Sequence, residues 1–452
     1  MINIKQANQA FVTERFGTAG YLYKEVFRKY PALRSALFWN LKEVKKRAAE
    51  YRYQLLADKH YADYLKFLPF SLRVLFVLPG PLNSNNGYHV QYYAHFLERC
   101  GVRCVFAVDD AFHDKKDFGI YSYTFLRDGY SGSFDIIHAW TPRERVRKLC
   151  DEMVRRHACP VIVHLEDNEK YLTEVLVGNP FDELEKMPLA MLDTVIPENC
   201  YHPLRGQKFL ANASGLTMII DTLRNFALER QPNLILPPPV DEQLFFSRPL
   251  NIRLRHEFGI SDNAIVFVYT GNVHPANCQE VLELYQAIEL LNKEGYHALL
   301  LRTGTNAENV HDENWDSRYV KALGWVERDH VPDILAAADI FVQPGTADDF
   351  NNKRIPSKLP EFFSIGRPVV LPKTNLGLSV RHGIDAYVVE NADATGIFNA
   401  VVQIEQSKEL KEQLSLGAVD FYREQFCGNQ SVADLLHFYI CVSSKFLKIQ
   451  KG

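Results

Sequence analysis

The segment DDFNNKRIPSKLPEFFSIGRPVVLP (residues 348–372) contains residue types that suit an anion-binding site. Pro356 can occupy the first position of a helix, where its missing N–H group would be unpaired anyway, and a glycine ten residues later can end that helix. The N–H groups and dipole at a helix start attract anions, and Arg354 and Lys358 add positive charge there. Glu361 follows one turn later, where a carboxylate can accept two hydrogen bonds from a vicinal diol such as ribose. The spacing suggests a nucleotide-diphosphate site, although a capped helix with a solvated charged end fits the same residues.

Polar residues also follow apolar runs that have the character of buried strands. His138 lies near the end of FDIIHAW (134–140), and His164 near the end of PVIVHLED (160–167). Ligands of open parallel sheets bind beyond the carboxyl ends of the strands. A single histidine at a strand end is usually packed or hydrogen-bonded. Two histidines on neighbouring strands support a functional role for His164 as strongly as a structural one. The same rule identifies four further strand-end segments where a ligand could bind, namely 81–89, Gly271–His274, Arg302–Gly304 and Gly345–Glu361.

Several common cofactor motifs are missing from the sequence. No GxGxxG follows either first strand, and GxxxxGK[ST] is absent, which argues against dinucleotide-binding and P-loop proteins. HExxH, an EF-hand loop and zinc-spaced cysteines are absent too, so we expect no protein-bound metal. The eight cysteines are dispersed, which is typical of reduced thiols in a cytosolic protein.

Strand and helix patterns alternate from residue 72 and restart at residue 264. Continuous apolar strands separated by helices predict α/β domains with parallel, doubly wound sheets. The first strand–glycine turns of the two series are 191 residues apart, so two such domains fit better than one sheet. The predicted organisation is a helical N-terminal extension (1–70), an N-terminal Rossmann-like domain (71–236), a C-terminal Rossmann-like domain (237–425) and a C-terminal helix (426–452).

The N-terminal extension is basic, although the whole chain is not. Residues 20–60 contain ten Lys or Arg and four acids, whereas the chain has a net charge of −4. Apolar residues recur at helical spacing, and Pro31 is expected to separate two helices. One interpretation is an extension packed on the first domain, and the other is a basic amphipathic surface in peripheral contact with anionic lipid. The overall charge argues against a nucleic-acid partner.

The chain lacks signals for membrane insertion or export. No apolar run reaches the roughly 18 residues needed to span a bilayer, and the N-terminus does not have the order of a secretion signal. We therefore expect a cytoplasmic protein, with the inner membrane face as the alternative location.

Taken together, four segments resemble the GT-B glycosyltransferases, specifically the retaining enzymes of family 4. LPPPVDEQLFF is similar to the family's linker, and YTGN to the glycine turn that opens its nucleotide domain. LGWVERDHVPDILAAADIFVQPG is similar to the stretch before the donor loop, and PSKLPEFFSIGRPVV to the helix whose glutamate holds the donor ribose. These segments occupy 236–246, 269–272, 323–345 and 356–370. The resemblance implies two Rossmann-like domains that face a cleft.

The resemblance also implies roles for individual residues. Glu361 would bind the ribose, and the amides around Ser357 and Lys358 the diphosphate. Gly271, with Asn272 beside it, would let the backbone approach the phosphate. Gly87 would belong to the N-terminal glycine turn, and His164 would lie near the donor sugar. The implied cofactor-binding set is Gly87, Gly271, Asn272, Arg302, Ser357, Lys358 and Glu361, and the implied catalytic set is His164, Arg354 and Asp349.

Two positions depart from the family pattern. Lys353 stands where many members have an acid over the donor sugar, and Asp348 or Asp349 would have to replace that acid. Asn272 and Asn277 stand near the places of an Arg and a Lys. The positive charge for the diphosphate would then come from other residues, namely Arg302, Lys353, Arg354 or Lys358.

The implied reaction transfers a sugar from a UDP- or GDP-sugar to an acceptor hydroxyl with retention of configuration and without a metal. A glycan or lipid-linked acceptor and surface-polysaccharide or glycoconjugate synthesis would suit this class. Two alternatives remain: a GT-B nucleotide-sugar epimerase, and a donor-binding scaffold with impaired catalysis. Lys353 and Asn277 motivate the scaffold alternative.

Overall fold

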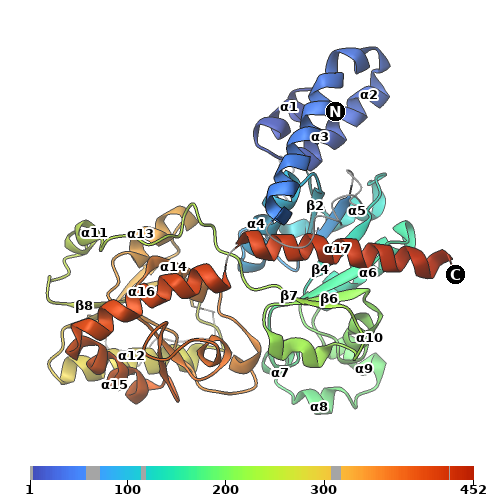
Figure 1. The fold of residues 1–452 in the computed structure, drawn as a ribbon. Coiled ribbons are helices and arrows are strands. Elements are labelled where there is room, and N and C mark those ends of the chain that lie inside the picture. Colours follow the sequence, from blue (N-terminus) through green and yellow to red (C-terminus); the bar gives the residue numbers. More distant parts are fainter. Residues whose placement is uncertain (1–3, 58–71, 113–118, 307–316, 427, 452) are drawn as a thin grey trace. The chain divides into compact units, whose positions relative to one another are not determined.

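The computed structural model describes residues 4–57, 72–112, 119–306, 317–426 and 428–451, and Figure 1 shows its fold. The chain forms two compact units. Unit 1 contains Met1–Pro239 and Gly428–Gly452, and unit 2 contains Val240–Cys427. The chain therefore leaves unit 1 after the proline run and returns to it for the last helix.

Unit 1 is built on a seven-stranded sheet in the order β3-β2-β1-β4-β5-β6-β7, and every pairing is parallel. The predicted apolar runs form its central strands, which are buried because helices cover both faces of such a sheet. The strands are β1 (Arg73–Val77), β2 (Arg103–Val108), β3 (Ile120–Ser122), β4 (Ile136–Trp140), β5 (Val161–Leu165), β6 (Gly215–Met218) and β7 (Asn233–Ile235).

The C-terminal helix α17 (Gly428–Lys451) completes the main core of unit 1. Its residues Leu436 and Tyr439 are buried with Phe76 and Trp140 from the sheet and Leu97 from α4. The expected separate C-terminal helix is thus a packed part of this unit. Its helices after the N-terminal extension are α4 (Asn85–Arg99), α5 (Tyr123–Asp128), α6 (Glu144–His157), α7 (Glu169–Val177), α8 (Phe181–Leu184), α9 (Leu189–Val195), α10 (Pro203–Asn212) and α17, with 3-10 turns η3 (Asp110–Phe112) and η4 (Asp221–Phe226).

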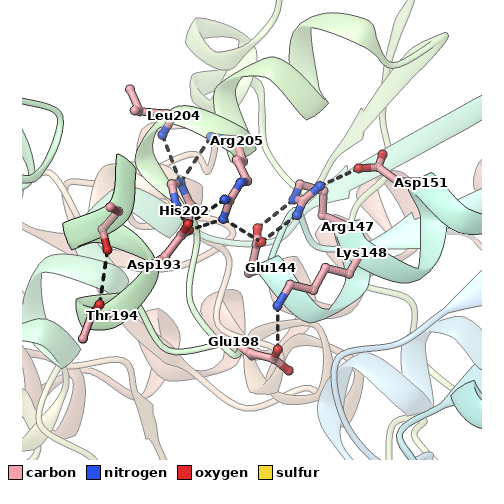
Figure 2. Close-up of polar contacts among 11 residues, drawn as sticks. Glu144, Arg147, Lys148, Asp151, Asp193, Thr194, Glu198, His202, Leu204 and Arg205 are labelled. Carbon is pink, nitrogen blue, oxygen red and sulfur yellow. Dashed lines mark hydrogen bonds and ion pairs between the residues drawn. The ribbon is translucent and has the colours of Figure 1, made fainter. Parts of the chain in front are cut away.

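The stretch between β5 and β6 folds into the four helices α7 to α10. Figure 2 shows the ion pairs that fasten it to α6. Glu144 of α6 accepts hydrogen bonds from Arg147 at 2.6 Å and lies 3.5 Å from Arg205 of α10. Arg205 in turn donates to Asp193 of α9 at 2.8 Å, and the His202 ring accepts from the backbone at the start of α10. This network fixes the helices beyond the carboxyl end of β5.

The N-terminal extension is helical, as predicted, and its described part contains three helices. Pro31 lies between the second and third of them, where it was expected to separate two helices. The three helices are α1 (Ile4–Val12), α2 (Phe16–Lys29) and α3 (Arg34–Ala57), with the 3-10 turn η1 (Pro31–Leu33) before α3. They share a small core of their own, to which Leu22, Tyr23 and Val44 contribute. Figure 1 shows them beside α4 and β2, and α2 contacts both elements.

Two contacts fasten α2 to the rest of unit 1. A Cβ atom on Gly17 would lie 2.1 Å from the Val102 carbonyl oxygen, so only glycine permits this approach. The buried Glu98 carboxylate accepts hydrogen bonds from the amide and hydroxyl of Thr18, each at 2.7 Å, and from the Cys104 amide at 2.8 Å. Because these bonds satisfy the buried carboxylate, the extension is a fixed part of unit 1.

Unit 2 repeats the parallel α/β arrangement with two three-stranded sheets, in the orders β10-β9-β8 and β11-β12-β13. A parallel bridge between Phe267 and Ile340 links the two sheets. The strands are β8 (Ile265–Tyr269), β9 (Ala298–Thr303), β10 (Val320–Gly324), β11 (Phe341–Val342), β12 (Val369–Pro372) and β13 (Tyr387–Val389). The helices are α11 (Ile252–Glu257), α12 (Cys278–Lys293), α13 (Val331–Leu335), α14 (Lys358–Ile365), α15 (Ala394–Gln406) and α16 (Lys408–Gln425), and the 3-10 turns are η5 (Ser317–Tyr319), η6 (Arg328–His330), η7 (Asn351–Lys353) and η8 (Asn375–Leu378).

The predicted α/β class with two doubly wound domains and an N-terminal helical extension is therefore confirmed. Within the described ranges, no helix has the length and apolar character to cross a membrane.

Candidate functional site

The carboxyl ends of β8 and β9 bring a tyrosine and two cationic residues of unit 2 together. Tyr269 and Arg302 are partners in the register of the two strands. The Lys358 Nζ atom, from the first turn of α14, lies 4.1 Å from the centre of the Tyr269 ring. Arg302 is buried, and its Nε atom has no hydrogen-bond partner among the described residues. This cationic cluster of Arg302 and Lys358 lies where ligands of parallel sheets bind.

Two glycine turns pack against each other beside this cluster. Gly271 has a φ of 122°, and Gly304 has a φ of 89°. A Cβ atom on Gly304 would lie 2.4 Å from the Gly271 carbonyl oxygen, so both turns need the backbone freedom of glycine. Asn272 accepts a hydrogen bond from the Thr305 amide at 2.9 Å, and Asn277 accepts one from the His274 amide at 2.8 Å. The two asparagines thus hold the turn after β8 in shape.

The helix expected to begin at Pro356 begins two residues later. The Pro356 carbonyl accepts a hydrogen bond from the Leu359 amide at 2.9 Å, so a single turn precedes α14. Ser357 is the N-cap residue, but its side chain makes no capping hydrogen bond. Gly366 ends the helix in the left-handed region with a φ of 77°, as its position in the sequence predicted.

Glu361 is buried in the first turn of α14 and forms an ion pair. The Arg328 Nη1 atom lies 2.6 Å from its Oε1 atom. The Arg328 guanidinium also lies over the Phe245 ring, 4.4 Å from its centre. The carboxylate expected to bind ribose is therefore held in place by a cation that the sequence reading did not identify.

Arg354 is buried and bonded within unit 2. Its Nη2 atom donates to both oxygens of Glu280, at 2.8 and 3.0 Å, and its Nε atom donates to Asn351 at 3.0 Å. The guanidinium also stacks on Phe350, 3.9 Å from the ring centre. Three partners fix this side chain, so its charge acts on the cationic cluster through space.

The two acids weighed as substitutes for the family's carboxylate differ in their surroundings. Asp348 accepts hydrogen bonds from the amides of Phe350 and Asn351, at 3.0 and 2.6 Å, and thereby starts the turn η7. Asp349 is 69% exposed and pairs with Lys353 at 2.5 Å. Asp348 thus has a structural role, whereas the exposed Asp349 pairs with a partly buried Lys353.

The positive charges in unit 2 change the protonation of their neighbours. Loss of hydration, followed by the charge of Arg354, lowers the pKa of Lys358 to about 7. Burial, followed by the charges of Arg354 and Lys358, lowers the pKa of His274 to about 4. Burial is the larger cause of both shifts, and the neighbouring positive charges lower the two pKa values further.

Unit 1 has its own set of polar residues at the carboxyl ends of its strands. His164 is buried, with its Nδ1 atom 2.8 Å from the Thr217 hydroxyl and its ring stacked on Trp140 at 4.1 Å. Burial lowers the pKa of His164 to about 4, so the ring is neutral at neutral pH. His138 bonds to the same hydroxyl at 3.0 Å and to Tyr439 at 2.7 Å, which is the packed state of an ordinary core histidine.

A buried carboxylate beside His164 is the main functional feature that the sequence reading left without a role. Glu166 Oε1 lies 2.9 Å from His89 Nδ1, accepts from Trp140 Nε1 at 2.7 Å and lies 3.9 Å from His164 Nε2. Its second oxygen accepts from Asn86. Burial alone would raise the pKa of Glu166, but the hydrogen bond and charge of His89 hold it below its ordinary value. The position of Glu166 at a strand end indicates a possible functional role. Its partners could not be predicted, because they lie on α4 and β4, far away in the sequence.

Gly87, expected in a phosphate-binding turn, lies in the first turn of α4. Its amide donates to the side chain of the N-cap residue Ser84 at 3.2 Å. A Cβ atom there would lie 2.3 Å from the Leu82 carbonyl oxygen. Helix packing therefore already requires glycine at this position.

The site residues divide between the two units. Unit 2 contains Gly271, Asn272, Arg302, Asp349, Arg354, Ser357, Lys358 and Glu361, and unit 1 contains Gly87 and His164. In the parts of the chain that the structure describes, no three His, Cys, Asp or Glu side chains are grouped so that they could hold a metal ion.

Comparisons with known proteins identify the class. Residues 264–407, which contain the cationic cluster, match the family model "Glycosyl transferases group 1". N-acetyl-alpha-D-glucosaminyl L-malate synthase of Bacillus anthracis is 23% identical over 210 residues. That match covers 44% of this chain and about half of the relative, 51% of its length.

Solved structures of low sequence identity share the fold. Anabaena Alr3699/HepE in complex with UDP and glucose has a TM-score of 0.60 at 14% identity, over 81% of this chain and 99% of that one. Sucrose-phosphate synthase of Thermosynechococcus elongatus has a TM-score of 0.63 at 12% identity, over 83% and 100%. The chain has the GT-B fold, and its residues 264–407 match the glycosyl transferases group 1 family.

Proposed function

We propose that this protein is a retaining glycosyltransferase that moves a sugar from a nucleotide-diphosphate sugar to an acceptor hydroxyl. The family match over residues 264–407 carries the proposal, because that segment contains both cations of the cluster and Glu361. Unit 2, which contains the matched segment, would bind the donor. Fold alone would not support this assignment, since one fold hosts many activities.

The donor we propose is a UDP- or GDP-sugar. Glu361, held by Arg328, would accept hydrogen bonds from the ribose hydroxyls through its carboxylate. The amides at Ser357 and Lys358 would bind the diphosphate at the start of α14, and Gly271 would let the turn after β8 approach it. HepE, which shares the fold, was crystallised with UDP-glucose, and this favours UDP as the first nucleotide to test.

Stabilisation of the leaving diphosphate would be the main catalytic contribution. As the bond from the anomeric carbon to the diphosphate oxygen breaks, negative charge develops on that oxygen. Lys358 and Arg302 would face this charge, and Arg354 would add to the field from its place beside Glu280. One preorganised donor of this kind is worth about 2.7–4 kcal/mol. The acceptor oxygen forms the new bond on the same face and gives its proton to the departing diphosphate.

His164 and Asp349 remain candidates for contacts with the donor sugar. A neutral His164 can donate or accept a hydrogen bond with a sugar hydroxyl without adding charge. Asp349 would have to leave its pair with Lys353 before it could reach a sugar. A glycan or lipid-linked acceptor, and a place in surface-polysaccharide or glycoconjugate synthesis on the cytoplasmic side, are the matching biological assignments.

A ligand screen followed by a turnover assay tests the proposal. One of UDP, GDP and ADP should raise the thermal unfolding temperature of the protein, because a ligand that binds only the folded state stabilises that state by mass action. The matching sugar nucleotide should then release its diphosphate when an acceptor hydroxyl is supplied. Lys373→Met is the control variant for Lys358→Met, because Lys373 is exposed and pairs with Glu390.

Three results would contradict the assignment in different ways. No thermal shift with any nucleotide would contradict donor binding. Binding without release of the diphosphate from any sugar nucleotide would indicate a scaffold. Conversion of the sugar in the absence of acceptor would indicate an epimerase.

A further inference from the structure

The outer face of α3 carries aromatic and basic side chains that do not pack against the protein core. Phe38, Trp39 and Tyr53 are 54%, 67% and 63% exposed. Lys42 and Lys46 lie between them, four residues apart, so they share this face of the helix. We call these five residues the aromatic-basic stripe.

The opposite face of α3 accounts for the packing of the helix. Val44 and Ala48 are fully buried in the core of the extension, and Leu37 and Leu41 pack against it. The stripe therefore has no role in holding α3 in place. An exposed tryptophan beside an exposed phenylalanine is uncommon on a face with no partner, and such residues mark interaction sites.

Side chains within the stripe contact one another through a cation–π pair and an aromatic pair. The Lys42 ammonium lies 4.6 Å from the centre of the Trp39 ring, and the Phe38 and Trp39 rings meet edge to face at 5.9 Å. A second pair occurs at the end of α2, where Lys29 lies 5.2 Å from the centre of the Tyr30 ring. Tyr30 is also exposed. Aromatic rings next to lysines are the side chains favoured in the headgroup region of a bilayer.

The charge of the extension points to an anionic partner. Residues 20–60 carry ten basic and four acidic side chains, a net charge of +6, within a chain whose net charge is −4. The rest of the chain therefore has a net charge of −10. A negatively charged surface would attract the extension and repel most of the remaining molecule, which selects an orientation.

We propose that the aromatic-basic stripe docks this protein on an anionic membrane surface. Lys42 and Lys46 would face the lipid phosphates, where Lys46 would exchange its exposed pair with Glu50, at 3.7 Å, for a phosphate. Trp39 and Phe38 would enter the headgroup boundary. A second copy of the chain fits less well, since two stripes of like charge would repel each other. Contacts at Gly17 and Glu98 fasten the extension to unit 1, so docking would hold the whole unit at the membrane. The inference is independent of sugar transfer, because binding is measured without it.

Sedimentation of the full-length protein with vesicles tests the proposal. Vesicles of phosphatidylcholine with phosphatidylglycerol should bind the protein, whereas pure phosphatidylcholine should bind it weakly, and added salt should release it. Each lysine near an anionic surface contributes about fivefold in affinity, so Lys42→Gln with Lys46→Gln should weaken binding by about twentyfold or more. Phe38→Ala with Trp39→Ala should weaken it without changing its salt dependence.

The control variant combines Lys408→Gln with Leu416→Ala on α16 of unit 2. Both side chains are as exposed as those of the stripe, and their loss should leave vesicle binding unchanged. Brominated lipid should quench the fluorescence of the wild type, and Trp39→Phe should remove most of that quenching. This readout does not depend on whether a double variant folds.

Equal binding to neutral and anionic vesicles would overturn the proposal. So would unchanged binding by both stripe variants, quenching that persists in Trp39→Phe, or a dimer that needs the stripe and does not bind vesicles. If the protein bound RNA through the stripe but did not bind vesicles, the stripe would be a nucleic-acid site instead.

Discussion

At the scale of single residues, unit 2 holds its charged side chains in place before any ligand arrives. Arg328 keeps the Glu361 carboxylate at 2.6 Å, and Glu280 keeps Arg354 at 2.8 Å. Lys358 has no ion-pair partner among the described residues and lies over the Tyr269 ring. Pairs that already exist cost no reorganisation on binding, whereas a cation without a pair gains most from an anionic ligand.

Glu361→Gln should weaken the binding of the cognate nucleoside diphosphate by roughly ten- to a hundredfold. The substitution keeps the shape of the side chain but removes the charge, and a hydrogen bond to a charged group contributes about 1.5–3 kcal/mol. Isothermal titration calorimetry measures the loss. Arg328→Met breaks the same ion pair but keeps the carboxylate, so it should weaken binding less than Glu361→Gln does. Equal affinities of Glu361→Gln and the wild type would remove the ribose assignment.

Nucleotide binding should weaken as the pH rises above about 7. The ammonium of free Lys358 has a pKa of about 7, so above that pH the lysine must take up a proton when it binds a diphosphate. Affinity should fall by up to about tenfold per pH unit between 7 and 9, until the raised pKa of the complex is reached. The charges of Arg354, Glu280 and Glu361 contribute to the pKa of Lys358, and His274, whose pKa is lowered to about 4, stays neutral over this range.

Titrations at several pH values check this expectation. Lys358→Met should bind more weakly and should show no comparable dependence between pH 7 and 9. Lys353→Met, which removes a cation paired with Asp349, should retain the slope of the wild type. A slope that survives in Lys358→Met would assign the proton to another group.

At the scale of elements, the long buried strands were predictable, whereas the edge strands β3, β7 and β10 were not. β1, β2, β4 and β5 are continuous apolar runs because helices cover both faces. β7 and β10 have no fully buried residue and β3 has one, so their sequences lack such a run. Helix α14 was predictable through Pro356 and Gly366. The pairs Glu361–Arg328 and Arg354–Glu280 were not, since their members are far apart in sequence.

Gly17→Ala should destabilise the protein by about 1–3 kcal/mol, the usual cost of overpacking. The new methyl group would lie 2.1 Å from the Val102 carbonyl oxygen, so α2 would have to move away from β2. Urea denaturation measures the free energy of unfolding. Gly80→Ala is the control, because the nearest atom to its Cβ would be the Ser84 hydroxyl at 3.9 Å. Equal stability of the two variants would mean that the extension is loosely attached.

At the scale of the whole molecule, the chain builds two units that each have a separate core. The main core of unit 1 includes residues of α17, which is added only after unit 2 is complete in the sequence. The core of unit 2 gathers around α12 and α15 with the strands of both its sheets. Because each core is closed by residues of its own unit, we expect the units to unfold as separate cooperative steps.

Leu436→Ala and Leu414→Ala should therefore affect different steps of thermal unfolding. Both leucines are fully buried, Leu436 in unit 1 and Leu414 in unit 2, and each truncation should cost about 2–5 kcal/mol. Scanning calorimetry with the cognate nucleotide assigns the steps, since the ligand should raise the transition of unit 2. Leu436→Ala should lower the other transition and leave the ligand-sensitive one in place, whereas Leu414→Ala should do the reverse. If both variants lower one common transition, the two cores unfold together, and α17 couples the end of the chain to the stability of the whole protein.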